Sequence, residues 1–168
     1  MVSSPTSSSL DAVVQRFIED AGRLTQSLGF GRVIGQIYAF LYFSRRPRCL
    51  SDLEHGLGIS KGSASMGVRQ LEQWSAVSKV WIKGDRKDYY EANDWFGQIL
   101  KNALVDTIGK KMTASTALVG ALESEVAALP NGDGDRAFIL DRIEHVKQFN
   151  NKVYKLWNSP TMKMLLGQ

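Results

Sequence analysis

The sequence has few of the residues that most chemical sites require. Among 168 residues there is one cysteine, Cys49, and the only two histidines, His55 and His145, lie far apart. A single cysteine excludes an internal disulfide and a thiolate metal cluster, and the sequence shows no paired-carboxylate or metal-ligand arrangement. We therefore expect neither an enzyme nor a bound metal or cofactor. A reducing cytoplasm is the simplest setting for such a chain.

Long apolar runs are absent as well. The longest candidate, "VIGQIYAFLYF" from Val33 to Phe43, is interrupted by Gln36. It falls short of the roughly 18 residues that a membrane span needs, so it predicts a buried helix. A mean hydropathy of -0.19 is typical of soluble globular proteins. Residues 1–9 lack the basic start and the apolar segment of a signal peptide, and we expect them to form a disordered tail.

Excess positive charge is confined to one part of the chain. Residues 29–93 hold ten Lys or Arg and six Asp or Glu, which gives the whole net charge of +4, because the rest of the chain holds eleven of each. A local excess of this sign is expected where a polyanion binds.

Helical periodicity flanks this basic block on both sides. Apolar residues at three-and-four spacing predict a helix over residues 10–28 that Gly29 ends, and a second one over residues 32–44. A further pattern runs from Asp94 to about Leu129, where "PNGDGD" breaks it at Pro130, and a last helix is expected from Arg136 to Trp157. The long helices exceed what a small domain can cover. Residues 10–30 and 94–168 are therefore predicted to form the dimerisation region of a homodimer.

Residues 49–74, "CLSDLEHGLGISKGSASMGVRQLEQW", predict two short helices joined by a tight turn. Ser51 and Ser60 are suited to cap the helices, and Gly58 is suited to the turn between them. Ala64, Val68 and Leu71 would form the buried side of the second helix. This arrangement is a helix-turn-helix.

The opposite side of the second helix is small and polar. A surface helix usually carries Glu and Lys, whereas this face has glycines and serines that cost helix stability. Small residues let a helix enter the major groove, where Ser, Gln and Arg can bond base edges and Met can touch thymine methyls. An ordinary solvated helix is the alternative. The outward set is Gly62, Ser63, Met66, Gly67, Arg69, Gln70 and Gln73.

The next segment, "VWIKGDRKDYYEA", changes to a strand-like pattern. It predicts a hairpin whose turn contains Gly84 and Asp85, and "RCL" at residues 48–50 could add a third strand. A hairpin directly after a recognition helix is a wing. Its aromatic strands should pack inward, so that Lys83, Arg86 and Lys87 at the tip reach DNA phosphates or the minor groove.

Together these patterns predict a mainly α (α+β) fold, a winged helix-turn-helix with a small β-hairpin wing and long dimerisation helices. The DNA-binding domain would span residues 31–93. The function that fits is a sequence-specific DNA-binding transcriptional regulator. A winged helix used only as a protein-protein interaction module is the alternative.

The segments "ISKGSASMGVRQLEQW" and "VWIKGDRKDYYEA" resemble the GbsR subgroup of the MarR-type winged helix-turn-helix regulators, and the resemblance extends over roughly residues 22–160. It implies a cytoplasmic homodimeric repressor of a palindromic operator in double-stranded DNA. Ser63 and Gly67 depart from the larger amides expected there, which puts the operator sequence in doubt. The implied DNA-binding residues are Ser60, Lys61, Gly62, Ser63, Ser65, Met66, Arg69 and Gln70, with Lys83, Arg86 and Lys87 in the wing.

The same resemblance suggests a small-molecule effector, because some members of the subgroup control choline or glycine betaine genes. Tyr38, Tyr42, Trp81 and Trp95 are candidates for an aromatic cage around a quaternary ammonium such as choline or a betaine, which cation-π attraction would favour. Aromatic residues at helical spacing are more often part of a core.

Overall fold

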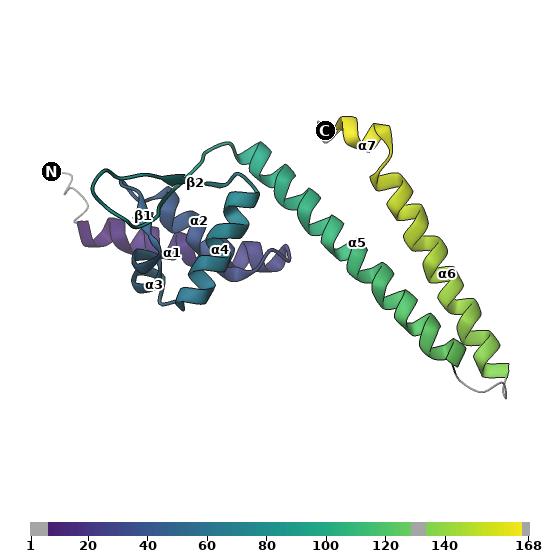
Figure 1. Ribbon diagram of the computed structural model, residues 1–168. Helices are drawn as coiled ribbons and strands as arrows, with labels where there is room; N and C mark the ends of the chain where they lie inside the picture. The colour runs from purple at the N-terminus through teal and green to yellow at the C-terminus, as the bar shows by residue number, and fades with distance from the viewer. Residues whose placement is uncertain (1–6, 129–133, 166–168) are drawn as a thin grey trace. The chain divides into compact units, whose positions relative to one another are not determined.

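The computed structural model describes residues 7–128 and 134–165, and the chain divides into two compact units, Met1–Leu104 and Val105–Gln168. Each unit is described by itself. The search of the described helices for an apolar stretch long enough to cross a membrane found none. The fold class expected from the sequence is confirmed: the chain is mostly helical, with one small antiparallel sheet (Figure 1).

The first unit begins with two helices packed closely together, α1 (Ser7–Ser27) and α2 (Arg32–Tyr42). Gly29 and Gly31 have positive φ angles of 79° and 98°, which allows the tight turn between the helices. A Cβ atom on Gly35 would lie 2.3 Å from the carbonyl oxygen of Ala21, so only glycine permits this approach. The predicted tail is wrong for residues 7–9, which are helical, and residues 1–6 lie outside the described residues.

A short strand and the two helices of the helix-turn-helix follow: β1 (Arg48–Cys49), α3 (Leu50–Leu57) and α4 (Lys61–Gln73). Gly58 ends α3 in the left-handed conformation at φ 63°, as expected of a helix C-cap glycine. The predicted cap of α3 is wrong. The helix starts at Leu50, and the carboxylate of Asp52 accepts the backbone N–H of Cys49 at 3.0 Å, so Ser51 lies inside the first turn.

The sheet has the strand order β1-β3-β2 and is antiparallel throughout, with β2 spanning Val77–Val80 and β3 spanning Tyr89–Ala92. The third strand at Arg48 is therefore confirmed. The hairpin strands are shorter than expected, because Val80 pairs with Tyr89 and residues 81–88 form a loop. Trp81 is 76% exposed, so the expectation that this aromatic residue packs inward is wrong.

The core of the first unit lies between α2, α3, α4 and the sheet. Ile37 and Leu53 are fully buried, and Val68 is 1% exposed. The predicted apolar side of α4 is confirmed, since Ala64 and Leu71 are buried with Val68. The first turns of α5 (Phe96–Ala128) also belong to this unit and bury Ala103 in the same core.

The second unit contains the remainder of α5 with α6 (Gly134–Trp157) and α7 (Pro160–Leu165). The α5 and α6 helices lie side by side (Figure 1), and they are joined by Lys147 to Glu123 at 2.9 Å and Asn150 to Ser115 at 3.1 Å. The predicted break at Pro130 lies outside the described residues. The α6 helix starts at Gly134, two residues before the predicted position, and α7 was not predicted.

Candidate nucleic-acid interface

The start of α4 is fixed by Ser60. Its hydroxyl oxygen accepts the backbone N–H of Ser63 at 3.1 Å, which satisfies one of the free amides in the first turn. The same hydroxyl donates to the Ser63 hydroxyl at 3.0 Å. The cap predicted at Ser60 is therefore confirmed, and the first turn of α4 presents two short hydroxyl side chains.

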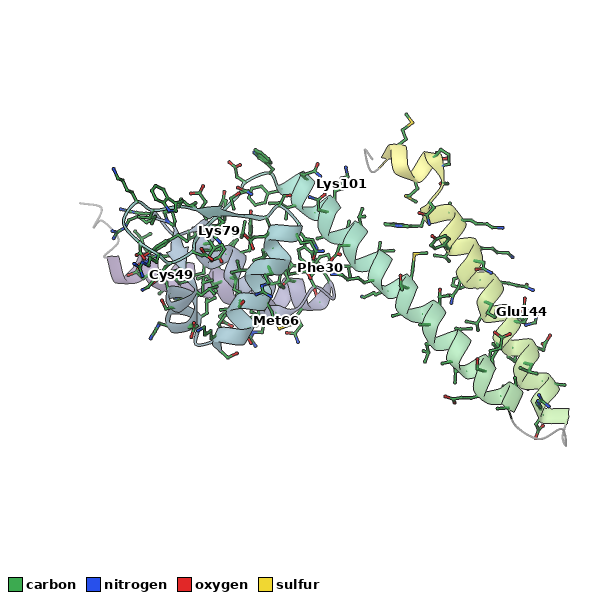
Figure 2. All side chains as sticks on the ribbon, in the orientation of Figure 1. Phe30, Cys49, Met66, Lys79, Lys101 and Glu144 are labelled. Atoms are coloured by element: carbon green, nitrogen blue, oxygen red, sulfur yellow. The ribbon has the colours of Figure 1, made fainter. Side chains whose placement is uncertain are left out.

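The outer face of α4 carries most of the residues expected to read DNA. Met66 is 73% exposed and projects from the helix (Figure 2), and Lys61, Gly62 and Arg69 are also exposed. The half-buried members are Ser63, Ser65 and Gln70. A Cβ atom on Gly62 would meet only the Ser60 hydroxyl oxygen, at 3.9 Å, so the surface is open here.

Gly67 does not belong to this face, and its predicted outward position is wrong. It is buried, and a Cβ atom on it would lie 2.5 Å from Cδ1 of Ile37. Ile37 itself is completely buried in α2. Gly67 is therefore the point at which α4 approaches α2 closely, and the absence of a side chain serves packing.

The wing loop is held in shape by Asp85. One carboxylate oxygen accepts the backbone N–H of Lys87 at 3.0 Å, and the other accepts the Tyr89 hydroxyl at 2.7 Å. The hydrogen bond from Tyr89, and to a smaller extent the one from the Lys87 backbone, lowers the pKa of Asp85. The hydrogen bond between Tyr89 and Asp85 also raises the pKa of Tyr89 to about 12. Gly84 adopts a φ of 88° at the turn, as its predicted position requires.

The cations of the loop are left available for a partner. Lys83, Arg86 and Lys87 are exposed and form no ion pair with any described residue. The neighbouring carboxylate of Asp88 instead pairs with Lys79 of β2 at 2.7 Å. The loop thus presents three positive charges on a backbone that Asp85 holds in place.

The two parts of the predicted site meet at one surface depression. Lys61 from the start of α4 and Lys87 from the wing both line a depression of about 380 Å³, together with Leu50 and Ser51 from the start of α3. Glu54 and Asp88 line the depression as well, so two cations and two carboxylates meet there. Ser51 is a residue of this surface that was not predicted from the sequence. Its place at the start of a short helix was the available signal.

The aromatic residues proposed as an effector cage do not come together as a set. Tyr38 and Tyr42 stack with ring centroids 6.0 Å apart, and Phe96 contacts both rings edge-on. These three rings line an apolar groove of about 400 Å³ between α1, α2 and α5. Trp81 and Trp95 are 76% and 68% exposed and are not among the residues that line the groove.

Among the residues that the structure describes, no group of three or more His, Cys, Asp or Glu side chains could hold a metal ion. Cys49 is buried, and its sulfur lies 3.0 Å from the hydroxyl of Ser51.

Comparison with known proteins finds that the chain is similar to proteins named as transcriptional regulators. No family model matches the sequence. The HTH-type transcriptional repressor OpcR of Bacillus subtilis is 27% identical over 120 residues, which cover 71% of this chain and 65% of OpcR. A second protein of the same organism, named "Putative HTH-type transcriptional regulator YvaV", is 25% identical over 120 residues, which cover 71% of this chain and 68% of YvaV. The chain thus matches about two thirds of the length of these curated relatives.

A solved structure supports the fold. The crystal structure of a transcriptional regulator, 19% identical in sequence, superimposes with a TM-score of 0.50 over 85% of this chain and 94% of that one. The shared architecture is the winged helix-turn-helix.

Proposed function

We propose that this protein is a sequence-specific DNA-binding transcriptional regulator, a cytoplasmic homodimer that represses transcription from a palindromic operator. The observation that carries the proposal is the surface on which the outer face of α4 and the cations of the wing lie together, with Lys61 and Lys87 beside one depression. We call this surface the DNA-binding surface: the outer face of α4 with Lys83, Arg86 and Lys87.

Each part of the DNA-binding surface has a separate task. The α4 helix enters the major groove, where Ser65, Arg69 and Gln70 bond base edges and Met66 contacts thymine methyl groups. The capped first turn, Ser60 to Ser63, lies against the backbone. Lys83, Arg86 and Lys87 contact phosphates or a narrow minor groove beside it. The relatives named as HTH-type regulators support DNA binding through the helix-turn-helix.

The most specific family placement is the GbsR subgroup of the MarR-type regulators. The motif residues of α4 and the wing support it, together with the resemblance in sequence to a repressor. A purely protein-binding winged helix remains the alternative. Such a module needs no free cations at the wing tip, whereas Arg86 forms no ion pair with any residue that the structure describes. No catalytic role is assigned to any residue.

Exposed apolar side chains support the homodimer. In the second unit four large apolar side chains are between 57% and 65% exposed: Leu118, Phe138, Phe149 and Leu156. Isolated monomers rarely expose this many large apolar residues, and burial against a second copy would cover them. A two-fold dimer would place two α4 helices on successive half-sites of an inverted repeat, about one turn apart.

The proposed effector is choline or a betaine, bound at the aromatic groove. Tyr38 and Tyr42, with Phe96, offer the ring faces that attract a quaternary ammonium. Titration calorimetry with choline and glycine betaine tests this directly. Saturable heat that is lost in Tyr42→Ala supports the site, and an absence of heat at millimolar ligand counts against it.

DNA binding is tested by fluorescence anisotropy on duplexes from the region upstream of the gene. We expect the association constant to fall steeply with salt. Arg86→Ala should weaken binding by about 1 to 3 kcal/mol if Arg86 reads a groove, or weaken it uniformly with a shallower salt slope if it contacts phosphate. Unchanged affinity in Arg86→Ala would remove this residue from the surface. The proposed function would be contradicted if the wild-type protein bound none of the upstream duplexes.

A further inference from the structure

Asn93 lies at the base of the wing, directly after β3, and ties the two ends of the hairpin together. Its backbone N–H donates to the carbonyl of Ala76 at 2.9 Å, and its side-chain amide donates to the carbonyl of Ser75 at 2.9 Å. Its side-chain oxygen accepts the Ser78 hydroxyl at 3.0 Å. The partners all belong to residues 75–78, through which the chain passes from α4 into β2.

The turn at Ser75 sets the direction in which the wing leaves α4. Ser75 has a φ of 59°, and it is the one non-glycine residue with a positive φ among those described. A backbone held in this region persists only where the surrounding contacts determine it. The contacts here include the backbone bonds from the Ser75 N–H to the Glu72 carbonyl and from the Ala76 N–H to the Leu71 carbonyl. The side chain of Asn93 adds the bond to the Ser75 carbonyl and is thus one of the groups that hold the turn.

Asn93 is itself held by a residue of α2. The hydroxyl of Tyr38, 55 residues earlier in the chain, donates to the backbone carbonyl of Asn93 at 2.6 Å. With this bond all four polar groups of Asn93 are engaged. Burial, with smaller contributions from Tyr42 and Asp94, raises the pKa of Tyr38 to about 12, so its hydroxyl keeps its proton at neutral pH.

We propose that Tyr38 is a positioning residue for DNA binding, which acts through Asn93 to fix the wing relative to the recognition helix α4. The inference rests on the proposed function. Its physical basis is that Lys61 of α4 and Lys87 of the wing lie beside one depression, and the proposed function requires α4 and the wing to contact the same duplex at the same time. A wing free to change its angle at Ser75 would lose this simultaneous contact.

The structure provides a matched control for this role. Tyr42 lies one helical turn from Tyr38, stacks on its ring and lines the same groove, but its hydroxyl has no hydrogen-bond partner among the described residues. Tyr38→Phe and Tyr42→Phe therefore remove the same atom from neighbouring rings. Tyr38→Phe should weaken binding to the upstream duplex roughly three- to tenfold, the range expected for one lost hydrogen bond. Tyr42→Phe keeps the ring face proposed for the effector, so in the absence of any effector it should bind the duplex as the wild type does.

A double-mutant cycle separates positioning from a general loss of stability. If Tyr38 acts through the wing, Tyr38→Phe should matter less once the wing cation Lys87 has been removed. The fold loss of DNA affinity in the double variant Tyr38→Phe/Lys87→Ala should then be smaller than the product of the fold losses in the two single variants. In the double variant Tyr38→Phe/Arg69→Ala, whose second change lies in α4, the fold losses of DNA affinity should multiply. Amide exchange should accelerate at residues 75–78 in Tyr38→Phe and stay unchanged in Tyr42→Phe.

The possible results fall into distinct classes. The positioning role would be overturned, while DNA binding stands, if Tyr38→Phe bound the duplex with wild-type affinity. It would also be overturned if the fold losses of affinity multiplied with Lys87→Ala as they do with Arg69→Ala. A wild-type protein that binds no duplex would instead overturn the proposed function, and the inference with it. Non-additive losses confined to the wing pair would support the inference.

Discussion

Two glycines of the same helix have opposite roles, and the contrast can be measured. Gly62 faces open space on the DNA-binding surface, whereas Gly67 is pressed against the buried Cδ1 atom of Ile37. We predict that Gly67→Val lowers the free energy of unfolding by about 1 to 3 kcal/mol, because the core around Ile37 is already filled. Gly62→Val should change it by less than about 1 kcal/mol. Urea denaturation of both variants checks the prediction, and equal loss in the two would show that Gly67 is not a packing contact.

Gly67 also shows what single residues conceal in a sequence. The apolar side of α4 was predictable because Ala64, Val68 and Leu71 recur at helical spacing and are buried. A glycine carries no hydropathy signal, so its face cannot be read from such spacing. The bond from Tyr38 to Asn93 joins residues 55 positions apart, and it follows from the packing of α2 on the sheet. Local sequence patterns contain no information on that contact.

At the scale of elements, the wing loop should depend on pH at both extremes. Asp85 has a pKa below its usual 3.8, so its contribution to loop order is present above that value and is lost as the pH falls through the lowered pKa. Tyr89 has a pKa raised from 10.0 to about 12, so its contribution is present below 10 and is lost as the pH rises through about 12. Chemical shifts of the Lys87 amide followed against pH should therefore be constant between these limits. A transition near neutral pH would contradict this account.

The two aspartates of the loop allow the effect of shape to be separated from that of charge. Asp85→Ala and Asp88→Ala each remove one negative charge near the cations, but only Asp85 bonds the loop backbone. We predict that Asp85→Ala speeds hydrogen exchange of the Lys87 amide and weakens DNA binding a few-fold. The loop of this variant is disordered in the free protein, so DNA binding has to overcome the entropy cost of ordering it. Asp88→Ala should bind DNA at least as tightly as the wild type. Equal behaviour of the two variants would show that loop order is irrelevant.

The wing is also the element whose extent the sequence predicted least well. Trp81 and Ile82 have strand propensity, yet pairing stops at Val80 and Tyr89. The hydrogen bonds of Asp85 set where the loop begins to turn, and side-chain contacts of this kind are invisible to strand propensity. The helices were predicted more accurately, because periodicity over ten or more residues is a strong signal. Most of their ends fell within a few residues of the observed ones.

At the scale of the molecule, the homodimer makes a prediction about the second unit. Phe149 is 65% exposed on α6, and the adjacent Gln148 is exposed and polar. Phe149→Asp should produce a monomer and lower affinity for the upstream duplex by more than about tenfold, because one half-site contact is lost. Gln148→Asp adds the same charge one residue away and should stay dimeric. Light scattering during size-exclusion chromatography distinguishes the two, and a dimeric Phe149→Asp would remove α6 from the interface.

The central claim is that the outer face of α4 and the wing tip touch the duplex, and site-specific photocrosslinking tests it most directly. A photoreactive amino acid is placed in turn at Met66, Arg86 and Gln148, and each protein is irradiated with the upstream duplex that the wild type retains. We expect covalent adducts with the duplex from positions 66 and 86, and none from position 148. The adduct from position 66 should form on a base inside the protected site. Adducts from position 148 alone, with positions 66 and 86 silent while the duplex stays bound, would contradict it.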